Sequence, residues 1–498
     1  MHIFVRACST AGECRFASDC LLPTAYCLLL SANCLLIRMF RRIQHVHFVG
    51  VGGIGMSGIA EVLVNLGFRV SGSDLKRSNV TDRLQQMGVE FTEGHGAENV
   101  GDAHVVVRST AVRDDNPEID EAQRRSIPVI PRAEMLAELM RLKPHTVAVA
   151  GSHGKTTTTS MVATVLGQAG LDPTIVVGGV VGAFGSNAHL GTSDLMVVEA
   201  DESDRSFLML TPTIAVVTNI DREHMDYHQT MERLNESFLA FVNKVPFYGV
   251  AVLCLDDAAV RALVPKVKKR LTTYGLSSEA DFSARDLHMR AASVEFSVLH
   301  RGKPLGKLRL HLPGRHSATN ALAAVAIAQE LEIPFSQVAE ALDAFTGIQR
   351  RFEIKGEPKG IMVIDDYGHH PAEIRATIGA IRDSWKRPLT VIFQPHRYSR
   401  TRDLFDEFLT AFEGADRLLL TEIYPAGEDA IPGVNSESLY QVIKRKGHME
   451  VEFVADKSQI TKTLAGKLSP GDIVLTLGAG DIYKVGEALL EALKGETE

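Results

Sequence analysis

Several short stretches of the sequence combine residue types that can bind phosphate, metal ions or carboxylates. The most specific is Gly151-Ser-His-Gly-Lys-Thr156, which follows a β-branched apolar run and precedes a helical pattern. Glycines let the backbone approach a phosphate, a helix N-terminus supplies N–H donors, and Lys155 adds a positive charge. The hydroxyl of Thr156 can bind Mg²⁺. This stretch predicts an ATP site, although its loop is shorter than the general phosphate-loop pattern.

Two further apolar runs end in polar clusters. The first is followed by the carboxylates Glu199, Asp201, Glu202 and Asp204. Carboxylates crowded at a strand end repel each other unless a cation or hydrogen-bond donors offset their charge, which predicts Mg²⁺ here, with a solvated acidic loop as the alternative. The second run is followed by Asn219 and His224, which a shared parallel sheet would bring to the phosphate end. A packing role for the histidine is the alternative.

A glycine-rich stretch near the start of the chain, Gly50-Val-Gly-Gly-Ile-Gly-Met-Ser57, lies between an apolar run and a helical pattern. A second apolar run ends at Asp74, as in the strand that delivers an acidic residue to a ribose. The pattern suggests a dinucleotide site, and a turn without a ligand is the alternative. The α/β unit is short for a full dinucleotide domain, so it fits one nucleotide half more easily.

The rest of the chain repeats the alternation of strands and helices. His316 and Asn320 lie four residues apart, on one face of an expected helix. In the last part of the chain, polar residues again follow apolar runs. Arg397 and Arg400 are suited to binding a carboxylate, and plain surface solvation is the alternative.

Composition indicates a globular protein without nucleic-acid or membrane partners. The chain has 498 residues, a net charge of -8 and 45% hydrophobic residues. Five of its six cysteines lie in residues 1–38, so the remainder is typical of a reduced cytoplasmic protein. For residues 1–38 a signal peptide, a metal or disulfide cluster and a start-site artefact compete. We favour the last, with a start at Met39 and a disordered or poorly packed extension.

Taken together, the motifs resemble those of the Mur ligases, the ATP-dependent amide ligases of peptidoglycan precursor synthesis. The matching stretches are Gly151–Thr157, Glu199–Asp204, Thr218–His224 and Pro313–Ala321. The resemblance implies an α/β protein with a Rossmann-like UDP-binding domain, a central P-loop ATPase-type domain and a C-terminal Rossmann-like domain. The expected bounds are 39–144, 145–347 and 348–498.

Within this family, three stretches are similar to the branch that joins L-alanine to UDP-N-acetylmuramate. They are Gly50–Ser57, Asp366–Pro371 and Gln394–Thr401. The resemblance implies ATP and Mg²⁺ as cofactors, UDP-N-acetylmuramate and L-alanine as substrates, and a monomer or homodimer in the cytoplasm. A ligase that recycles a ready-made tripeptide is the alternative. An oxidoreductase, suggested by the first glycine loop, and a non-catalytic nucleotide-binding protein are more distant ones.

The resemblance also implies roles for individual residues. ATP would be bound by Gly151, Ser152, His153, Gly154, Lys155, Thr156, Thr157, His316, Asn320, Arg351 and Asp366. The UDP-sugar would be bound by Gly50, Gly52, Gly53, Ile54, Gly55, Met56, Ser57, Asp74, Ser109 and Thr110. Metal ligands would be Thr156, Glu202 and His224, and the amino acid would meet His369, His396, Arg397 and Arg400. Catalysis would rest on Lys155, His224, Arg351, His369 and Arg397.

One position departs from the sister enzymes of the family. Where they carry a carbamylated lysine after the metal-binding histidine, this chain has Phe238. We therefore predict no such modification, and the resemblance leaves open how a second Mg²⁺ would be completed.

Overall fold

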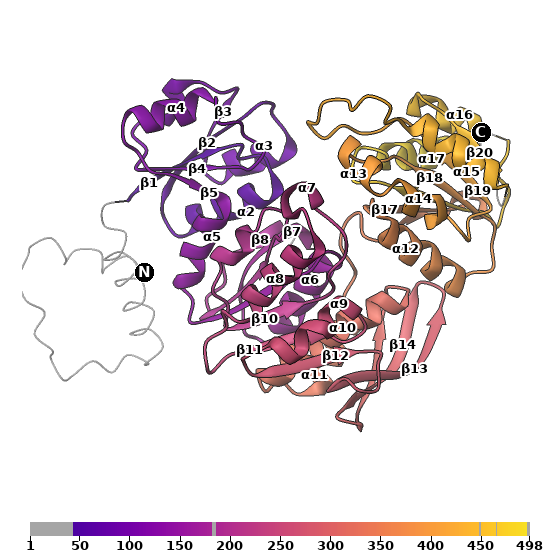
Figure 1. The fold of residues 1–498 in the computed structure, drawn as a ribbon, viewed down its shortest axis with the longest axis horizontal. Coiled ribbons are helices and arrows are strands. Elements are labelled where there is room, and N and C mark those ends of the chain that lie inside the picture. The colour runs from indigo at the N-terminus through magenta and orange to yellow at the C-terminus, as the bar shows by residue number, and fades with distance from the viewer. Residues whose placement is uncertain (1–42, 182–185, 448–449, 465, 496–498) are drawn as a thin grey trace, which may run out of the picture. The chain divides into compact units, whose positions relative to one another are not determined.

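The computed structural model describes residues 43–181, 186–447, 450–464 and 466–495. The expectation of a poorly packed N-terminal extension concerns residues outside these ranges. The described residues form three β-sheets, each built from its own stretch of chain and accompanied by helices (Figure 1). The predicted α/β fold class is therefore confirmed. Among the described helices, none is long and apolar enough to cross a membrane.

The first sheet is entirely parallel, with the order β3-β2-β1-β4-β5. Its strands are β1 (His45–Val49), β2 (Arg69–Asp74), β3 (Glu90–Glu93), β4 (Val105–Arg108) and β5 (Val129–Pro131). Its helices are α2 (Ile54–Asn65), α3 (Asn79–Gln86), α4 (Pro117–Arg124) and α5 (Arg132–Arg141). The strand order reverses at β1, where open parallel sheets bind their ligands, and the glycine loop follows this strand.

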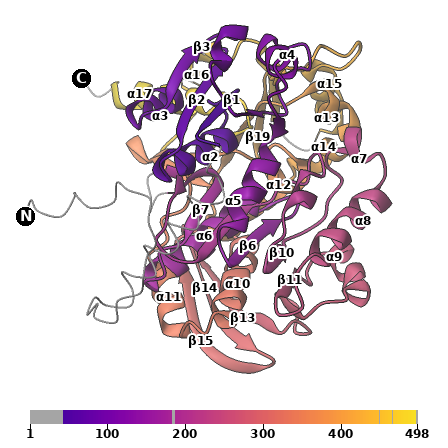
Figure 2. The ribbon, with the colours of Figure 1, turned by 90° about the vertical axis from the view of Figure 1, so that its left-hand side faces the viewer.

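The middle sheet is larger, with the order β15-β14-β13-β12-β11-β10-β6-β9-β7-β8. Its strands are β6 (His145–Ala150), β7 (Thr174–Val181), β8 (Ser186–His189), β9 (Leu195–Glu199), β10 (Ile214–Val217), β11 (Val250–Cys254), β12 (Leu271–Gly275), β13 (Phe282–Arg290), β14 (Ser293–His300) and β15 (Lys303–Leu310). Its helices are α6 (Lys155–Gln168), α7 (Met225–His228), α8 (Met231–Val242), α9 (Ala258–Leu263), α10 (Arg315–Glu330) and α11 (Phe335–Asp343). The phosphate-loop strand β6 lies between β10 and β9, so the polar clusters after all three strands reach one edge. Helix α6 packs beside β6 and β7 (Figure 2).

The last sheet has the order β16-β17-β21-β18-β19-β20, with only its β16–β17 pair antiparallel. Its strands are β16 (Glu353–Gly356), β17 (Met362–Asp366), β18 (Leu389–Phe393), β19 (Arg417–Leu420), β20 (Glu450–Phe453) and β21 (Ile473–Leu477). Its helices are α12 (Pro371–Ser384), α13 (Tyr398–Asp403), α14 (Phe405–Ala411), α15 (Ser436–Lys446), α16 (Ile460–Leu464) and α17 (Tyr483–Gly495).

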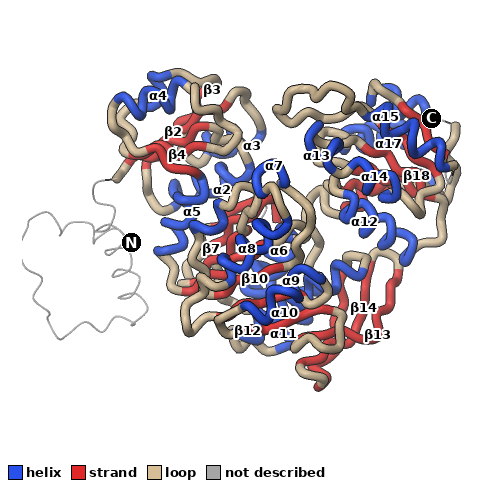
Figure 3. The backbone as a smooth tube through the Cα atoms, viewed as in Figure 1, coloured by secondary structure: helices blue, strands red, loops and turns tan. Residues whose placement is uncertain are grey.

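Burial on both faces explains why the strands of this last sheet read as continuous apolar runs. In β17, Met362 and Ile364 belong to one buried cluster, whereas Val363 belongs to another. Successive side chains of a strand point to opposite faces, so both faces must be covered. Figure 3 shows helices in blue around the red strands of this sheet. The strand ends are thereby fixed, and the loops that follow them can carry the polar residues.

Candidate functional site

The phosphate loop is fixed by the residues that follow β10. The Thr218 hydroxyl donates to the His153 carbonyl at 2.6 Å, and the His153 N–H donates to Asn219 Oδ1 at 2.8 Å. Gly151 has a φ of +139°, and a Cβ added there would lie 2.0 Å from Thr218 Oγ1. Glycine is therefore required where the two strand ends meet. Asn219 lies at the phosphate loop, as the strand-end argument predicted.

Lys155 begins α6 and forms a nearly buried ion pair with Glu202. Its Nζ lies 2.9 Å from the carboxylate, and the Glu202 side chain is only 1% exposed. Burial alone would lower the pKa of Lys155, but the carboxylates of Glu202 and Asp201 outweigh it and raise that pKa above its ordinary value. Lys155 therefore carries its charge at the mouth of the phosphate loop.

A candidate metal group lies next to this pair. Single ligand atoms of Glu202, Glu223 and His224 are all within 4.8 Å of one another. Burial lowers the pKa of His224, which keeps its imidazole neutral and able to bind a metal. Two carboxylates and an imidazole suit a divalent cation, and carboxylate oxygens are what Mg²⁺ prefers. Thr156, in the first turn of α6, is buried.

The other three carboxylates after β9 do not join this group, so the four do not crowd together as we expected. Glu199 accepts from the Gly178 N–H at 2.8 Å, and Asp204 accepts from the Ser206 N–H at 2.9 Å. Asp201 pairs with Arg132 at 3.0 Å. Each of these three carboxylates has its own donor, which satisfies its charge without a metal.

A pocket of about 640 Å³ lies beside the start of α10. Its lining residues are Leu255, Asp256, Ala258, Arg261, Leu276, Ser277, Arg315, His316 and Thr319. Most of these side chains are polar or charged, and Leu255, Ala258 and Leu276 add an apolar surface against which a planar ring could lie. A Cβ added to Gly154 would lie 3.0 Å from Asn320 Oδ1, so Asn320 borders the phosphate loop. His316 and Asn320 thus connect the pocket to the loop.

Two of the predicted ATP-binding residues, Arg351 and Asp366, belong to the last sheet region. The Arg351 guanidinium lies over the Tyr367 ring at 4.8 Å, a cation–π contact. Asp366 is buried and accepts from the Phe352 N–H at 2.8 Å and the Gly368 N–H at 2.6 Å. Burial raises the pKa of Asp366 to about 6. In this structure Asp366 holds backbone in place, a role that sequence did not suggest.

The residues predicted around the amino acid gather only in part. Arg400 Nη2 lies 2.7 Å from Glu223 Oε1, and His369 Nε2 lies 3.5 Å from the same oxygen. The His396 ring is next to that of His369, with centroids 5.6 Å apart. Arg397 instead approaches Glu428 at 3.8 Å and is 40% exposed. His369, His396 and Arg400 therefore form one group, from which Arg397 is turned aside.

The glycine loop after β1 is held by Asp74, whose Oδ2 accepts from the Gly52 N–H at 2.8 Å. Ser109 borders this loop near Gly50, and Ile54 is 48% exposed. Met56 is buried in the core, and its N–H donates to the Gly53 carbonyl at 3.0 Å. Arg132 lies beside Gly55 and pairs with Asp201, which connects this loop to the middle sheet.

Several residues of the site were missed by sequence reasoning. They are Arg132, Asp221, Glu223, His370 and Glu373. Glu223 adjoins His224, which was a usable signal. His370 and Glu373 form a capping box at the start of α12, a pattern that sequence can reveal.

Phe238 is fully buried on α8, with its ring 5.2 Å from that of Phe207.

Comparison with known proteins identifies the family. The models "Mur ligase family, catalytic domain", "Mur ligase middle domain" and "Mur ligase, glutamate ligase domain" match residues 45–144, 149–328 and 350–480. The chain belongs to the Mur ligase family. As in that family, the three matched regions carry the three sheets and their strand-end loops in order.

Curated relatives extend this match over most of the Mur ligase chain. The UDP-N-acetylmuramate–L-alanine ligase of Geotalea uraniireducens is 56% identical over 92% of this chain and 100% of its own. That of Geobacter sulfurreducens is 57% identical over 92% of this chain and 99% of its own. A solved UDP-N-acetylmuramate–alanine ligase from Thermotoga maritima has a TM-score of 0.78 at 30% identity, covering 91% of this chain and all of that one.

Proposed function

We propose that this protein is an ATP-dependent ligase that joins L-alanine to the carboxylate of UDP-N-acetylmuramate in peptidoglycan precursor synthesis. The observation that carries the proposal is the name shared by full-length relatives more than 50% identical to the chain. The positively charged phosphate loop and the Arg400 group, which could hold a nucleotide and a carboxylate, support it. We place the reaction in the cytoplasm, where ATP is supplied.

ATP would lie between the middle and last sheets. The backbone of residues 151–157 and Lys155 would hold its phosphates, and the pocket next to His316 would receive the adenine. Asn320 and Arg351 would contact the nucleotide from either side. Asp366 supports this region by fixing the backbone at Phe352, next to Arg351.

Mg²⁺ would be held by Thr156, Glu202 and His224, with Glu223 as a further candidate. When bound, it would offset the negative charge of the phosphates as the substrate carboxylate approaches. Binding there requires Glu202 to exchange part of its contact with Lys155 for the ion. Lys155 is then free to turn to the phosphates, which is the exchange expected of a phosphate-loop lysine.

The reaction would proceed through an acyl phosphate. The muramyl carboxylate attacks the terminal phosphorus of ATP and ADP leaves, with Lys155 and Arg351 stabilising the charge. The deprotonated amine of alanine then attacks the acyl carbon, the nitrogen gives up a proton, and phosphate leaves. Water would hydrolyse this intermediate, so the site must exclude it.

The two substrates would bind on opposite sides of the ATP site. The UDP group would meet the glycine loop, Asp74, Ser109 and Thr110, and Asp74 also holds the loop through the Gly52 N–H. Alanine would meet His369, His396 and Arg400, whose guanidinium could pair with its carboxylate. Arg397 would have to turn inward from Glu428 to take part.

The test is ADP release from UDP-N-acetylmuramate, ATP and Mg²⁺, with either L-alanine or the L-alanyl-γ-D-glutamyl-diaminopimelate tripeptide. Release that depends on L-alanine is expected, and release with the tripeptide alone would assign the chain to the recycling ligases instead. Lys155→Ala should abolish release. Lys462→Ala, an exposed lysine on α16, is the matched control and should leave it unchanged.

A further inference from the structure

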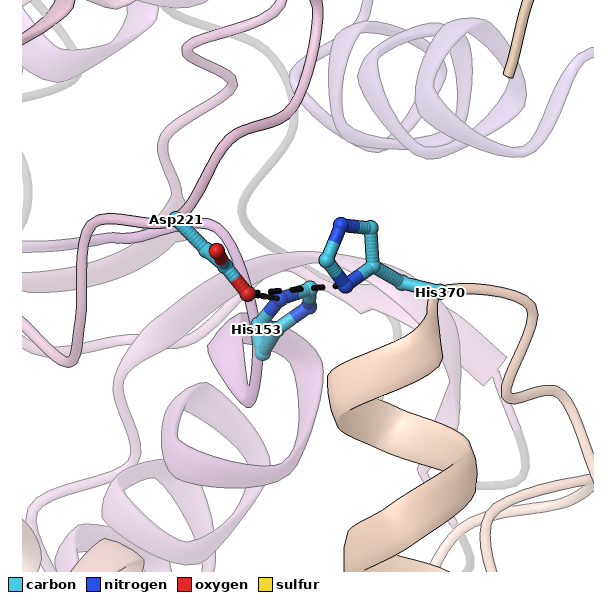
Figure 4. A group of neighbouring side chains, drawn as sticks. All are labelled: His153, Asp221 and His370. Carbon is cyan, nitrogen blue, oxygen red and sulfur yellow. Dashed lines mark hydrogen bonds and ion pairs between the residues drawn. The ribbon is translucent and has the colours of Figure 1, made fainter. Parts of the chain in front are cut away.

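Three side chains converge beside the phosphate loop in a group separate from Glu202, Glu223 and His224. His153 belongs to the loop, Asp221 follows β10, and His370 caps the N-terminus of α12. We propose that His153, Asp221 and His370 form a binding site for a divalent transition-metal ion of the zinc class (Figure 4). The inference concerns a new site and does not rest on the proposed function.

The geometry of the three ligand atoms carries the proposal. His153 Nε2 lies 2.9 Å from Asp221 Oδ2, and His370 Nδ1 lies 3.5 Å from the same oxygen. Figure 4 shows both rings turned toward this carboxylate. Metal–ligand bonds of about 2.0–2.1 Å place neighbouring ligand atoms roughly 3 Å apart. Two of the three spacings are close to this value, and all three ligand atoms lie within 4.8 Å of one another.

The second ring nitrogen of His153 faces a carboxylate, as in many metal-binding histidines. This nitrogen, Nδ1, lies 3.3 Å from Glu373 Oε1. Histidines that bind a metal commonly donate their second N–H to a carboxylate, which orients the ring and raises its basicity. Glu373 would be that partner, and it is itself fixed by the His369 N–H at 3.0 Å.

His370 provides the second nitrogen from a buried position. Its side chain is almost fully buried, and its Nδ1 accepts from the Ala372 N–H at a long 3.3 Å. A metal ion at Nδ1 would replace this weak contact with a stronger one. Asp221 keeps 35% of its side chain exposed, which leaves a path for the ion and room for a water ligand.

The ligand types determine which ion would bind. Two imidazoles and one carboxylate favour zinc, cobalt or nickel over Mg²⁺, which prefers oxygen ligands. The Mg²⁺ that accompanies ATP would therefore not occupy this site. A bound ion would replace the proton that His153 shares with Asp221, and it would fasten α12 to the phosphate loop.

The experiment titrates metal-free, full-length protein with Co²⁺ in the presence of excess Mg²⁺ and follows the visible absorption of the ion. The key variant is His370→Asn, because asparagine also caps helices well and should preserve α12. It should weaken Co²⁺ binding at least tenfold. Glu373→Gln should weaken it about 10–100-fold, as losses of such carboxylate partners do.

Two variants serve as controls for location. His224→Asn removes the other candidate metal group, and His311→Asn removes an exposed histidine that pairs with Asp343. Both should bind Co²⁺ at this site as the unmodified protein does. Absorption that disappears with His224→Asn and persists in His370→Asn would overturn the proposal. Absence of Co²⁺ binding by the unmodified protein would overturn it as well, and Asp221→Asn repeats the test on an independent ligand.

Discussion

Arg400 and Glu223 are an ion pair in which both side chains are nearly buried, at 10% and 8% exposure. They lie 177 residues apart in the chain, on α13 and just before α7. A buried guanidinium needs a partner at all times, because an unpaired buried charge is costly. If Arg400 binds the carboxylate of alanine as proposed, Glu223 is the partner of Arg400 when the amino acid is absent.

Replacing Arg400 with lysine should test whether Arg400 binds the carboxylate of alanine. Lysine keeps the charge but cannot form the bidentate contact that a carboxylate makes with arginine. We expect the KM for L-alanine to rise about tenfold or more, while the KM for ATP stays within twofold. Steady-state kinetics with Arg402→Lys as the control, an arginine 53% exposed two residues away, would check this. Equal losses in both variants would contradict the role.

Glu118 is a second buried carboxylate, in the first sheet region. It accepts from Ser73 Oγ and Asn99 Nδ2, both at 2.6 Å, and His47 lies 3.5 Å away. Burial opposes its ionisation, but the contacts from His47 and Ser73 outweigh burial and hold its pKa below the ordinary 4.5. The ionised form therefore stabilises the fold above pH 4.5, and this stability is lost as the pH falls below that value.

Glu118→Gln should thus lower the free energy of unfolding by about 2 kcal/mol at neutral pH. The difference from the unmodified protein should shrink as the pH falls below 4.5, where both side chains become neutral. Urea unfolding at several pH values measures it, with the exposed Glu98→Gln as control. If the difference in free energy of unfolding stayed constant with pH, the charge of Glu118 would not be what stabilises the fold.

At the scale of elements, the parallel strands and their following loops were largely predictable. Continuous apolar runs such as Leu389–Phe393 match buried parallel strands, and polar residues after β6, β9 and β10 do meet at one edge. The antiparallel strands β13, β14 and β15 were not predicted, because their pattern mixes exposed and buried residues, although Gly302 marks the turn between β14 and β15. Pairs such as Arg400 with Glu223 have no local signal, since they depend on how distant loops approach.

The ends of β6 and β10 approach so closely that we expect a side chain at Gly151 to disturb the phosphate loop. Gly151→Ala would place a Cβ against Thr218, displacing the phosphate loop, and kcat/KM for ATP should fall at least 100-fold. Gly379→Ala is the matched control, because Gly379 lies inside α12 with open space around it. That change should stabilise the protein by about 0.5–1 kcal/mol in thermal or urea unfolding and leave activity intact. Similar kinetics for both variants would contradict the packing argument.

At the scale of the whole molecule, several ion pairs join the middle and last sheet regions. The contacts include Arg400 with Glu223, His153 with Glu373 and Arg222 with Glu407. Such an interface is weaker than an apolar one and can open, which a ligase must do to admit substrates and release products. ATP, bound by residues of both regions, would favour the closed form.

We therefore expect high salt to open the molecule and an ATP analogue to close it. Salt screens the more exposed of these pairs, whereas the nucleotide adds contacts to both regions. Small-angle scattering should give a larger radius of gyration at high salt than at low salt, and a smaller one with the analogue. Unchanged scattering under all three conditions would contradict movement between the regions.

The phenylalanine at position 238 bears on whether the activity of the protein depends on dissolved carbon dioxide. A carbamylated lysine forms only when a lysine amine takes up carbon dioxide, so an enzyme built on it is sensitive to the dissolved gas. Phe238 has no amine, and its buried ring packs against Phe207. This protein should work equally well in buffer stripped of carbon dioxide and bicarbonate, which frees the first amino-acid addition from the availability of that gas.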